Sequence, residues 1–172
     1  LMTHTSGIAA DLPLYTMQIT RSEAADAILR SKPVCKCGEQ TVYSCMGYIL
    51  LGKILEQVYD MPLDKLVKQE VFEPLGMKYA SYCPNDYLPF AATELDPITN
   101  RYLCGEVHDE NARFLNGVSG NAGIFATMDD MKAFAQMLAN GGKGYLSSRA
   151  FSLALHDFTP QCSESRGLGF YL

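Results

Sequence analysis

Apolar residues recur every three or four positions through the middle of the chain, and this spacing predicts amphipathic helices. The clearest helix is expected over residues 45–59, with Ser44 well placed as its N-cap. Its buried face is predicted to carry Gly47, Leu51, Ile54, Leu55 and Val58. A further helix should open at Pro62, because the first turn does not need the N–H that proline lacks, and end at Pro74 and Gly76. The apolar face of this further helix comprises Leu63, Leu66, Val67 and Val71.

Another helix is predicted nearer the start of the chain. Residues 22–30 are strong helix formers behind Ser22, which is expected to cap them, and Pro33 stops the helix. The segments on either side, residues 8–20 and 32–42, lack helical or strand periodicity and are predicted to be loops.

The last third of the chain should contain two more helices. Thr127–Asp130 has the form of a capping box, since a carboxylate follows the threonine by three positions. The helix behind it is predicted to end at the Gly141–Gly142 pair. Its buried residues should be Met131, Phe134, Ala135 and Leu138. A short final helix, capped by Ser147 or Ser148, should run to Leu155.

Strand signals are weak by comparison. Ala91–Glu94 and Tyr102–Val107 could form brief strands, and the glycine-dense segment Gly117–Gly123 predicts a tight turn. The pattern as a whole is helix-rich, with short strands at the edges.

Composition and charge narrow the class of protein. Apolar residues make up 48% of the 172 residues and charged residues 19%, which is typical of a globular chain that folds around a core. The net charge is −5 and no two basic residues are adjacent, so nucleic acid is not an expected partner. No apolar run approaches the roughly 20 residues of a membrane span.

Six cysteines leave several readings open. Cys35 and Cys37 form a Cys-x-Cys pair, and the others are scattered at positions 45, 83, 104 and 162. A zinc site usually needs pairs two to four residues apart with matching partners, so we expect no metal site. Free thiols in a reducing compartment are favoured over disulfides, and on this ground a cytoplasmic location is favoured over an extracytoplasmic one.

Several segments together carry a family resemblance. The stretch Thr41–Glu56 places a tyrosine and a serine at the mouth of an apolar helix, and Phe72–Met77 ends the next helix with Pro-Leu-Gly-Met. With the segments 1–7, 106–112 and 117–125, they resemble the serine β-lactamase-like superfamily, which includes penicillin-binding proteins and related esterases. The closing residues 166–171 resemble a strand of the same superfamily.

This resemblance implies a fold and a chemistry. In the superfamily an antiparallel sheet packs against a helical lobe, and a serine is acylated before water releases the acyl group. The resemblance therefore implies an α+β fold that is predominantly helical, with residues 1–172 forming part of one domain and no second domain. Tyr43 matches the tyrosine of a Tyr-x-Asn motif and would be the general base or acid. Cys45 stands where that motif has asparagine, and Asn121 stands where a histidine is usual. With Gly123, these two residues are expected to bind substrate, and no cofactor is implied.

The superfamily's nucleophile motif, Ser-x-x-Lys, does not occur in these residues. We therefore expect the chain to be an internal fragment, inactive alone, that lacks both the nucleophile helix and the C-terminal strands. The expected substrate of the parent is an ester, a β-lactam or a D-amino-acid peptide. Self-association is also expected, through apolar surface that truncation would expose. The alternative is a non-catalytic descendant that binds a cell-wall peptide or a protein partner.

Other readings of the same residues remain at this point. Tyr43 could be an aromatic residue at the helix boundary without a catalytic role, and Ser44 could serve only as the helix N-cap. Ser44 could instead be a nucleophile itself. Cys45 could act with His108 and Asp109 as a thiol hydrolase. The segment His4–Gly7 is interpreted as a structural turn.

Overall fold

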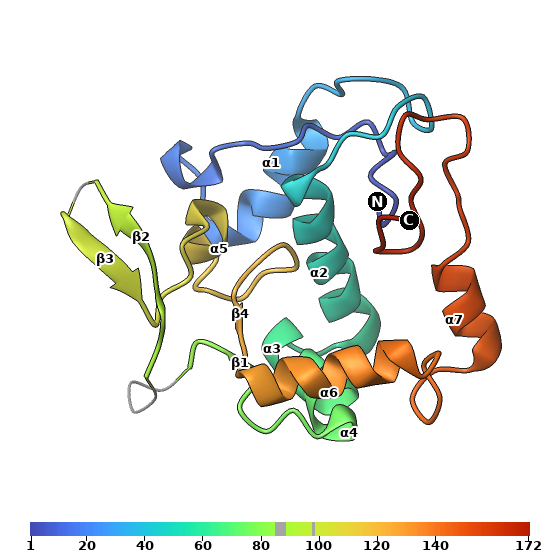
Figure 1. The fold of residues 1–172 in the computed structure, drawn as a ribbon. Coiled ribbons are helices and arrows are strands. Elements are labelled where there is room, and N and C mark those ends of the chain that lie inside the picture. Colours follow the sequence, from blue (N-terminus) through green and yellow to red (C-terminus); the bar gives the residue numbers. More distant parts are fainter. Residues whose placement is uncertain (85–88, 98) are drawn as a thin grey trace.

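Helix α2 (Cys45–Tyr59) forms the centre of the molecule in the computed structural model, which describes residues 1–84, 89–97 and 99–172 (Figure 1). The hydroxyl of Ser44 caps it, accepting a hydrogen bond from the Gly47 N–H at 3.0 Å, as the sequence predicts. The helix ends at Asp60, whose left-handed backbone (φ 49°) breaks the helical pattern.

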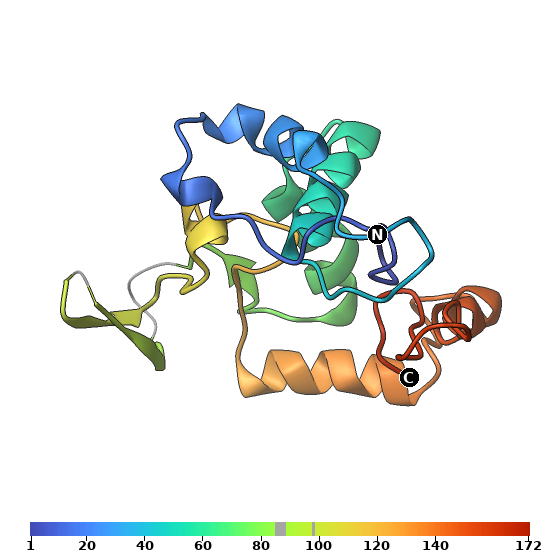
Figure 2. The ribbon, with the colours of Figure 1, turned by 90° about the horizontal axis from the view of Figure 1, so that it is seen from above.

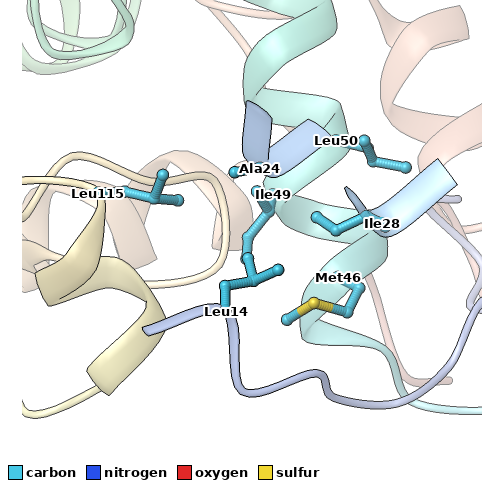
Figure 3. Packing of buried hydrophobic residues seen from close by; sticks show 7 residues of the cluster. All are labelled: Leu14, Ala24, Ile28, Met46, Ile49, Leu50 and Leu115. Atoms are coloured by element: carbon cyan, nitrogen blue, oxygen red, sulfur yellow. The ribbon is translucent and has the colours of Figure 1, made fainter. Parts of the chain in front are cut away.

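The buried face of α2 differs from the predicted one. Met46, Gly47, Ile49, Leu50 and Gly52 are buried, whereas Ile54, Leu55 and Val58 are exposed. The difference arises because the preceding helix α1 and the loop before it cover the first half of α2, while the outer side of its second half faces solvent. Figure 3 shows the resulting core. It consists of Leu14, Ala24, Ile28, Met46, Ile49, Leu50 and Leu115.

The N-terminal part supplies one side of this core. Two 3₁₀ turns, Leu14–Thr16 and Arg21–Glu23, lead into α1 (Ala24–Arg30). The capping residue is Thr20 rather than the predicted Ser22. Thr20 and Glu23 form a capping box, while the Ser22 hydroxyl only pairs with that of Thr20.

The segment after α2 folds as one irregular helical unit. It comprises α3 (Leu63–Val67), a π-helical stretch (Lys68–Phe72) and α4 (Glu73–Leu75), and it ends at Gly76 with φ 69°. The predicted burial of Leu63 and Leu66 is confirmed, and Val67 and Val71 are half-buried. A second small core of Phe72, Met77 and Ala80 joins this unit to α6.

Strands are short and occur in two antiparallel pairs within the described residues. Strand β1 (Ser81–Tyr82) pairs with β4 (Ile124–Phe125), a pairing that the sequence did not indicate. Strands β2 (Ala92–Asp96) and β3 (Arg101–Cys104) form a hairpin close to the predicted positions. The hairpin extends away from the helical body in both views (Figures 1 and 2).

Three further helices complete the fold. The short α5 (Glu110–Phe114) was not predicted; Asp109 caps it by accepting from the Ala112 N–H at 2.7 Å. Helix α6 (Met128–Ala139) has the expected capping box, and α7 (Ser148–Ala154) is capped by Ser147. Within the described part of the chain, every helix is too short or too polar to cross a bilayer.

The face that α6 buries is rotated from the predicted one. Asp130 and Met137 are buried, while Met131 and Ala135 are exposed. The reason is that the Asp130 carboxylate turns inward, accepting hydrogen bonds from the N–H groups of Thr127 (3.0 Å) and Tyr79 (3.2 Å). Burial opposes ionisation of this carboxyl, but these hydrogen bonds outweigh it and lower its pKa.

The last residues return to the start of the chain. The final loop contacts the first residues, because the Gly169 N–H donates to the Met2 carbonyl at 3.3 Å. A bridge between Arg166 and Tyr171 closes this final loop. The loop therefore lies against the segment that leads into α2, where the cleft described next is found.

Candidate functional site

A cleft of about 310 Å³ lies at the N-terminal end of α2. Three parts of the chain that are distant in sequence form it: the first residues, the entry to α2 and the loop before β4, closed on one side by the final loop. Its lining includes Met2, His4, Tyr43, Ser44, Cys45, Tyr48, Asn121 and Arg166. Three of the four residues predicted to form the site, Tyr43, Cys45 and Asn121, are thus brought together.

Tyr43 stands at the mouth of the cleft with 63% of its surface exposed. It belongs to the segment that enters α2, and it lines the cleft. The Val42 N–H donates to the His4 carbonyl at 2.8 Å, and the Ser44 N–H donates to His4 Nδ1 at 3.0 Å. The ring of Tyr43 lies 4.6 Å from that of His4, centroid to centroid.

Cys45 and Asn121 meet because the loop before β4 presses on α2. A Cβ on Gly120 would lie 2.0 Å from the Tyr48 carbonyl oxygen, so only glycine permits this approach. The loop is held by Tyr82, whose hydroxyl donates to the Ser119 carbonyl at 3.0 Å. The Ser119 hydroxyl in turn donates to Asn121 Oδ1 at 2.7 Å.

The Asn121 amide nitrogen is buried, and among the described residues it has no hydrogen-bond partner of standard geometry. Its neighbour is the Cys45 thiol. Burial raises the pKa of Cys45, and the carboxylates of Asp109 and Asp11 raise it further, whereas the adjacent Asn121 amide lowers it by favouring the thiolate. The thiol is therefore neutral near pH 7 and offers only a weak donor to the cleft.

Arg166 provides the cationic side chain of the cleft, and no lysine is among the described residues that line it. Its guanidinium pairs with Glu164 and lies 4.7 Å from the ring centroid of Tyr171. Tyr48 lies deeper, and its pKa is raised by burial and by Tyr43, with Arg166 opposing. The positive charge of Arg166 is therefore paired with the Glu164 carboxylate and also lies over the Tyr171 ring.

A larger and mainly apolar cavity of about 690 Å³ adjoins the cleft, sharing Gly120 and Asn121 with it. Gly123, the fourth predicted site residue, lines this cavity and not the cleft that contains Tyr43. Gly123 has a positive φ of 115°, and a Cβ at this position would lie 2.2 Å from the Gly117 carbonyl oxygen. Both features favour glycine here. The side chains around it include Tyr82, Phe90, Val107, His108 and Phe125.

The alternative nucleophiles are poorly placed. The Ser44 hydroxyl caps α2 and donates to the Ala9 carbonyl at 2.7 Å, and the residue is 1% exposed. Cys45 lines the cleft, whereas His108 lines the larger cavity and Asp109 caps α5. All six cysteines are free, and within the described residues no three metal-ligating side chains cluster.

A family model described as Beta-lactamase matches residues 1–172. The chain belongs to the beta-lactamase family. A related Salmonella typhi protein, provisionally assigned as a D-alanyl-D-alanine carboxypeptidase, is 31% identical over 194 residues, which cover 98% of this chain and 44% of that protein. A Salmonella newport protein of the same description matches to the same extent. The chain therefore spans less than half the length of these curated relatives.

Solved structures of the beta-lactamase family share the fold. A penicillin-binding protein homologue from Pyrococcus abyssi superposes with a TM-score of 0.71 at 22% identity, covering 98% of this chain and 41% of that one. A penicillin-binding protein from Bacillus halodurans gives 0.69 at 21% identity, covering 98% and 53%. At these identities the likeness establishes the fold alone.

Three residues of the cleft were not singled out from the sequence as functional. His4 and Tyr48 flank Tyr43, and Arg166 approaches from the far end of the chain. The only sequence signal for His4 was the segment His4–Gly7, which was interpreted as a structural turn. No local pattern marks Tyr48 or Arg166, because their places depend on how distant segments pack.

Proposed function

We propose that this member of the beta-lactamase family is part of a serine hydrolase that cleaves an ester, a β-lactam or a D-amino-acid peptide through an acyl-serine. The observation that supports this most directly is the exposed Tyr43 at the mouth of a cleft that also contains Cys45 and Asn121. The curated relatives are assigned as D-alanyl-D-alanine carboxypeptidases, which agrees with a D-amino-acid peptide as the substrate. The acylated serine and its lysine are supplied from outside residues 1–172, since no Ser-x-x-Lys occurs within them.

In this mechanism Tyr43 moves protons. The serine oxygen attacks the substrate carbonyl while Tyr43, acting as the phenolate, takes its proton and becomes the phenol; this phenol then gives the proton to the leaving group when the carbonyl re-forms. Water then releases the acyl group by the same route in reverse. Asn121 and Cys45 line the path of the substrate beside Tyr43.

The adjoining apolar cavity is proposed to hold the side chain of the acyl group. Its walls include Tyr82 and Phe125, and it opens onto the cleft at Gly120 and Asn121. Gly123 contributes backbone to this wall, which is the binding role proposed for it. An apolar or aromatic acyl substituent fits such a lining better than a charged one.

A second candidate function is binding without turnover. Cys45 and Asn121 both depart from the residues usual in the resemblance, and the two departures face each other in the cleft. A non-catalytic protein that holds a cell-wall peptide or a protein partner would tolerate such changes. The two functions differ in whether a covalent acyl-enzyme forms.

Intact-mass analysis of the full-length protein after incubation with a fluorophosphonate, and separately with a penicillin, tests the proposal. We expect one adduct per chain with at least one reagent, mapping outside residues 1–172. Tyr43→Phe should slow its formation by about 10²- to 10⁴-fold, because it removes only the proton-transfer group. Tyr59→Phe, at the exposed far end of α2, is the matched control and should react as the wild type. No adduct with either reagent would favour the binding protein.

A further inference from the structure

His4 contacts the chain at each of three consecutive positions around Tyr43. We propose that His4 is the positioning residue for Tyr43: its carbonyl and its neutral imidazole hold the backbone on both sides of the tyrosine, and its ring face orients the phenol. This inference rests on the proposed function in one respect, since it takes Tyr43 as the proton-transfer group.

His4 accepts a hydrogen bond from each neighbour of Tyr43. The residue before Tyr43 donates its N–H to the His4 carbonyl at 2.8 Å, and the residue after it donates its N–H to His4 Nδ1 at 3.0 Å. One histidine therefore holds the backbone of the residues before and after the tyrosine. The Ser44 hydroxyl also caps α2 and donates to the Ala9 carbonyl. Tyr43 therefore directly precedes a residue whose backbone N–H and side chain are both held by hydrogen bonds.

The ring contacts add an orientation. The imidazole contacts two phenols, at 4.6 Å from the Tyr43 ring and 4.9 Å from the Tyr48 ring, centroid to centroid. Tyr48 comes from the first turn of α2, and its hydroxyl donates to the Met2 carbonyl at 3.2 Å. The imidazole thus packs on a ring fixed to the helix, and Tyr43 packs on the imidazole.

His4 itself is built into the fold. It is 5% exposed, and its backbone is left-handed (φ 57°), in a turn closed by its N–H donating to the Leu1 carbonyl at 2.9 Å. A left-handed backbone is unfavourable for most residues, and asparagine tolerates it best among those with a side chain. The turn aims both the carbonyl and Nδ1 at the segment that carries Tyr43.

The hydrogen bond to Nδ1 requires a neutral ring with its proton on Nε2. The charged and titratable groups around it are Arg166, Glu164 and the two phenols. Burial lowers the pKa of His4, Arg166 lowers it further, and Glu164 opposes this lowering. Protonation of Nδ1 would bring two donors face to face, so acid should release the segment around Tyr43.

Two substitutions in the full-length protein separate the contacts. His4→Asn keeps an acceptor near the position of Nδ1 and suits the left-handed backbone, but it does not titrate. His4→Phe keeps the ring and loses the acceptor. His156→Asn is the matched control, because His156 is exposed, packs on Phe158 and does not line the cleft.

In acylation assays from pH 5 to pH 9, we expect His4→Phe to lose about 10- to 100-fold in kcat with little change in KM, since the reacting groups are misplaced while binding remains. His4→Asn should stay within about threefold of wild type at pH 8 and lose the fall in rate that the wild type shows on the acid side. The His156→Asn profile should match wild type. Equal rates and equal acid limbs in all variants would overturn the proposal.

A second readout does not depend on turnover. In protein labelled with ¹⁵N-histidine and ¹³Cζ-tyrosine, we expect the Nε2–H tautomer at His4, and a shifted Tyr43 signal in His4→Phe but not in His156→Asn. An Nδ1–H tautomer, or an unmoved Tyr43 signal, would refute the positioning role. If the wild type forms no acyl-enzyme, the proposed function fails while these spectra still decide whether His4 positions Tyr43. If His4→Phe does not fold, the tautomer and the His4→Asn profile decide.

Discussion

Cys45 and Asn121 form a contact that neither residue would indicate alone. The amide nitrogen of Asn121 is buried beside a thiol, which is a weak acceptor while it is protonated and a much stronger one as the thiolate. The amide therefore favours the charged form of Cys45, whereas burial and the nearby carboxylates favour the neutral form.

Removing the Asn121 amide should therefore raise the pKa of Cys45 still further. Asn121→Leu keeps the volume and deletes the donor, so alkylation of Cys45 by iodoacetamide should require a higher pH than in the wild type. Mass spectrometry across a pH series measures the midpoint for each cysteine. Cys104, exposed on the hairpin, serves as an internal control and should be alkylated to the same extent in both proteins. An unchanged or lower midpoint at Cys45 would show that the amide does not act on the thiol.

At the scale of elements, the cleft depends on how closely the loop before β4 approaches α2. Gly52 and Gly120 face each other: a Cβ on Gly52 would lie 3.0 Å from the Gly120 nitrogen, and one on Gly120 would lie 2.0 Å from the Tyr48 carbonyl oxygen. Gly47, on the same helix, has only ordinary contacts, the nearest at 3.5 Å from the Ser44 hydroxyl. Close backbone contacts therefore explain the glycines at positions 52 and 120 but not the one at position 47.

Alanine substitutions at these glycines should give a graded series. Gly120→Ala forces the loop off the helix and should lower the free energy of unfolding by about 2–3 kcal/mol. Gly47→Ala fits without displacement and should raise it by about 0.5–1 kcal/mol, because alanine favours the helix. Gly52→Ala should fall between them. Urea unfolding of the full-length variants provides the values, and a Gly120→Ala protein as stable as wild type would contradict the packing.

The same elements show what the sequence can predict. The ends of α2 and the capping box of α6 were predicted correctly, because caps and helix breakers are local chemistry. The buried faces of both helices were predicted only in part: Gly47 is buried as expected, whereas Val58 on α2 and Met131 on α6 are exposed. The choice among several apolar positions depends on neighbours that the local pattern does not contain. Helix α5 was missed because five residues are too few to show a period.

The candidate site follows the same division. Tyr43, Cys45 and Asn121 were proposed from motif positions, and the fold brings them into one cleft. Gly123 lines the adjoining cavity instead. His4 was interpreted as structural because its contacts with the segment around Tyr43 exist only once the first residues and the entry to α2 lie together.

At the scale of the whole molecule, one apolar surface lacks a cover within the described residues. The second half of α2 presents Ile54, Leu55, Val58 and Tyr59, with Val58 71% exposed. Apolar patches larger than a few hundred Å² are uncommon on isolated soluble proteins and usually contact a partner. The modest net charge of −5 gives only limited repulsion between copies.

Produced alone, the polypeptide of residues 1–172 is therefore expected to self-associate. Its mass by light scattering should rise with concentration, and Val58→Lys should reduce the rise by placing a charge in the patch. Leu153→Lys, at an exposed position on α7, is the control and should change it less. A constant monomer mass over the whole concentration range would disprove the expectation.

The facing pair of Gly52 and Gly120 also constrains how this protein can be engineered or diversified. A library that aims at new substrates can vary Cys45 and Asn121, because both residues line the cleft. Randomising the two glycines would instead destabilise most members, since a Cβ at either position meets backbone atoms of the facing segment. The positions that line the cleft therefore tolerate more substitutions than the two glycines directly behind it.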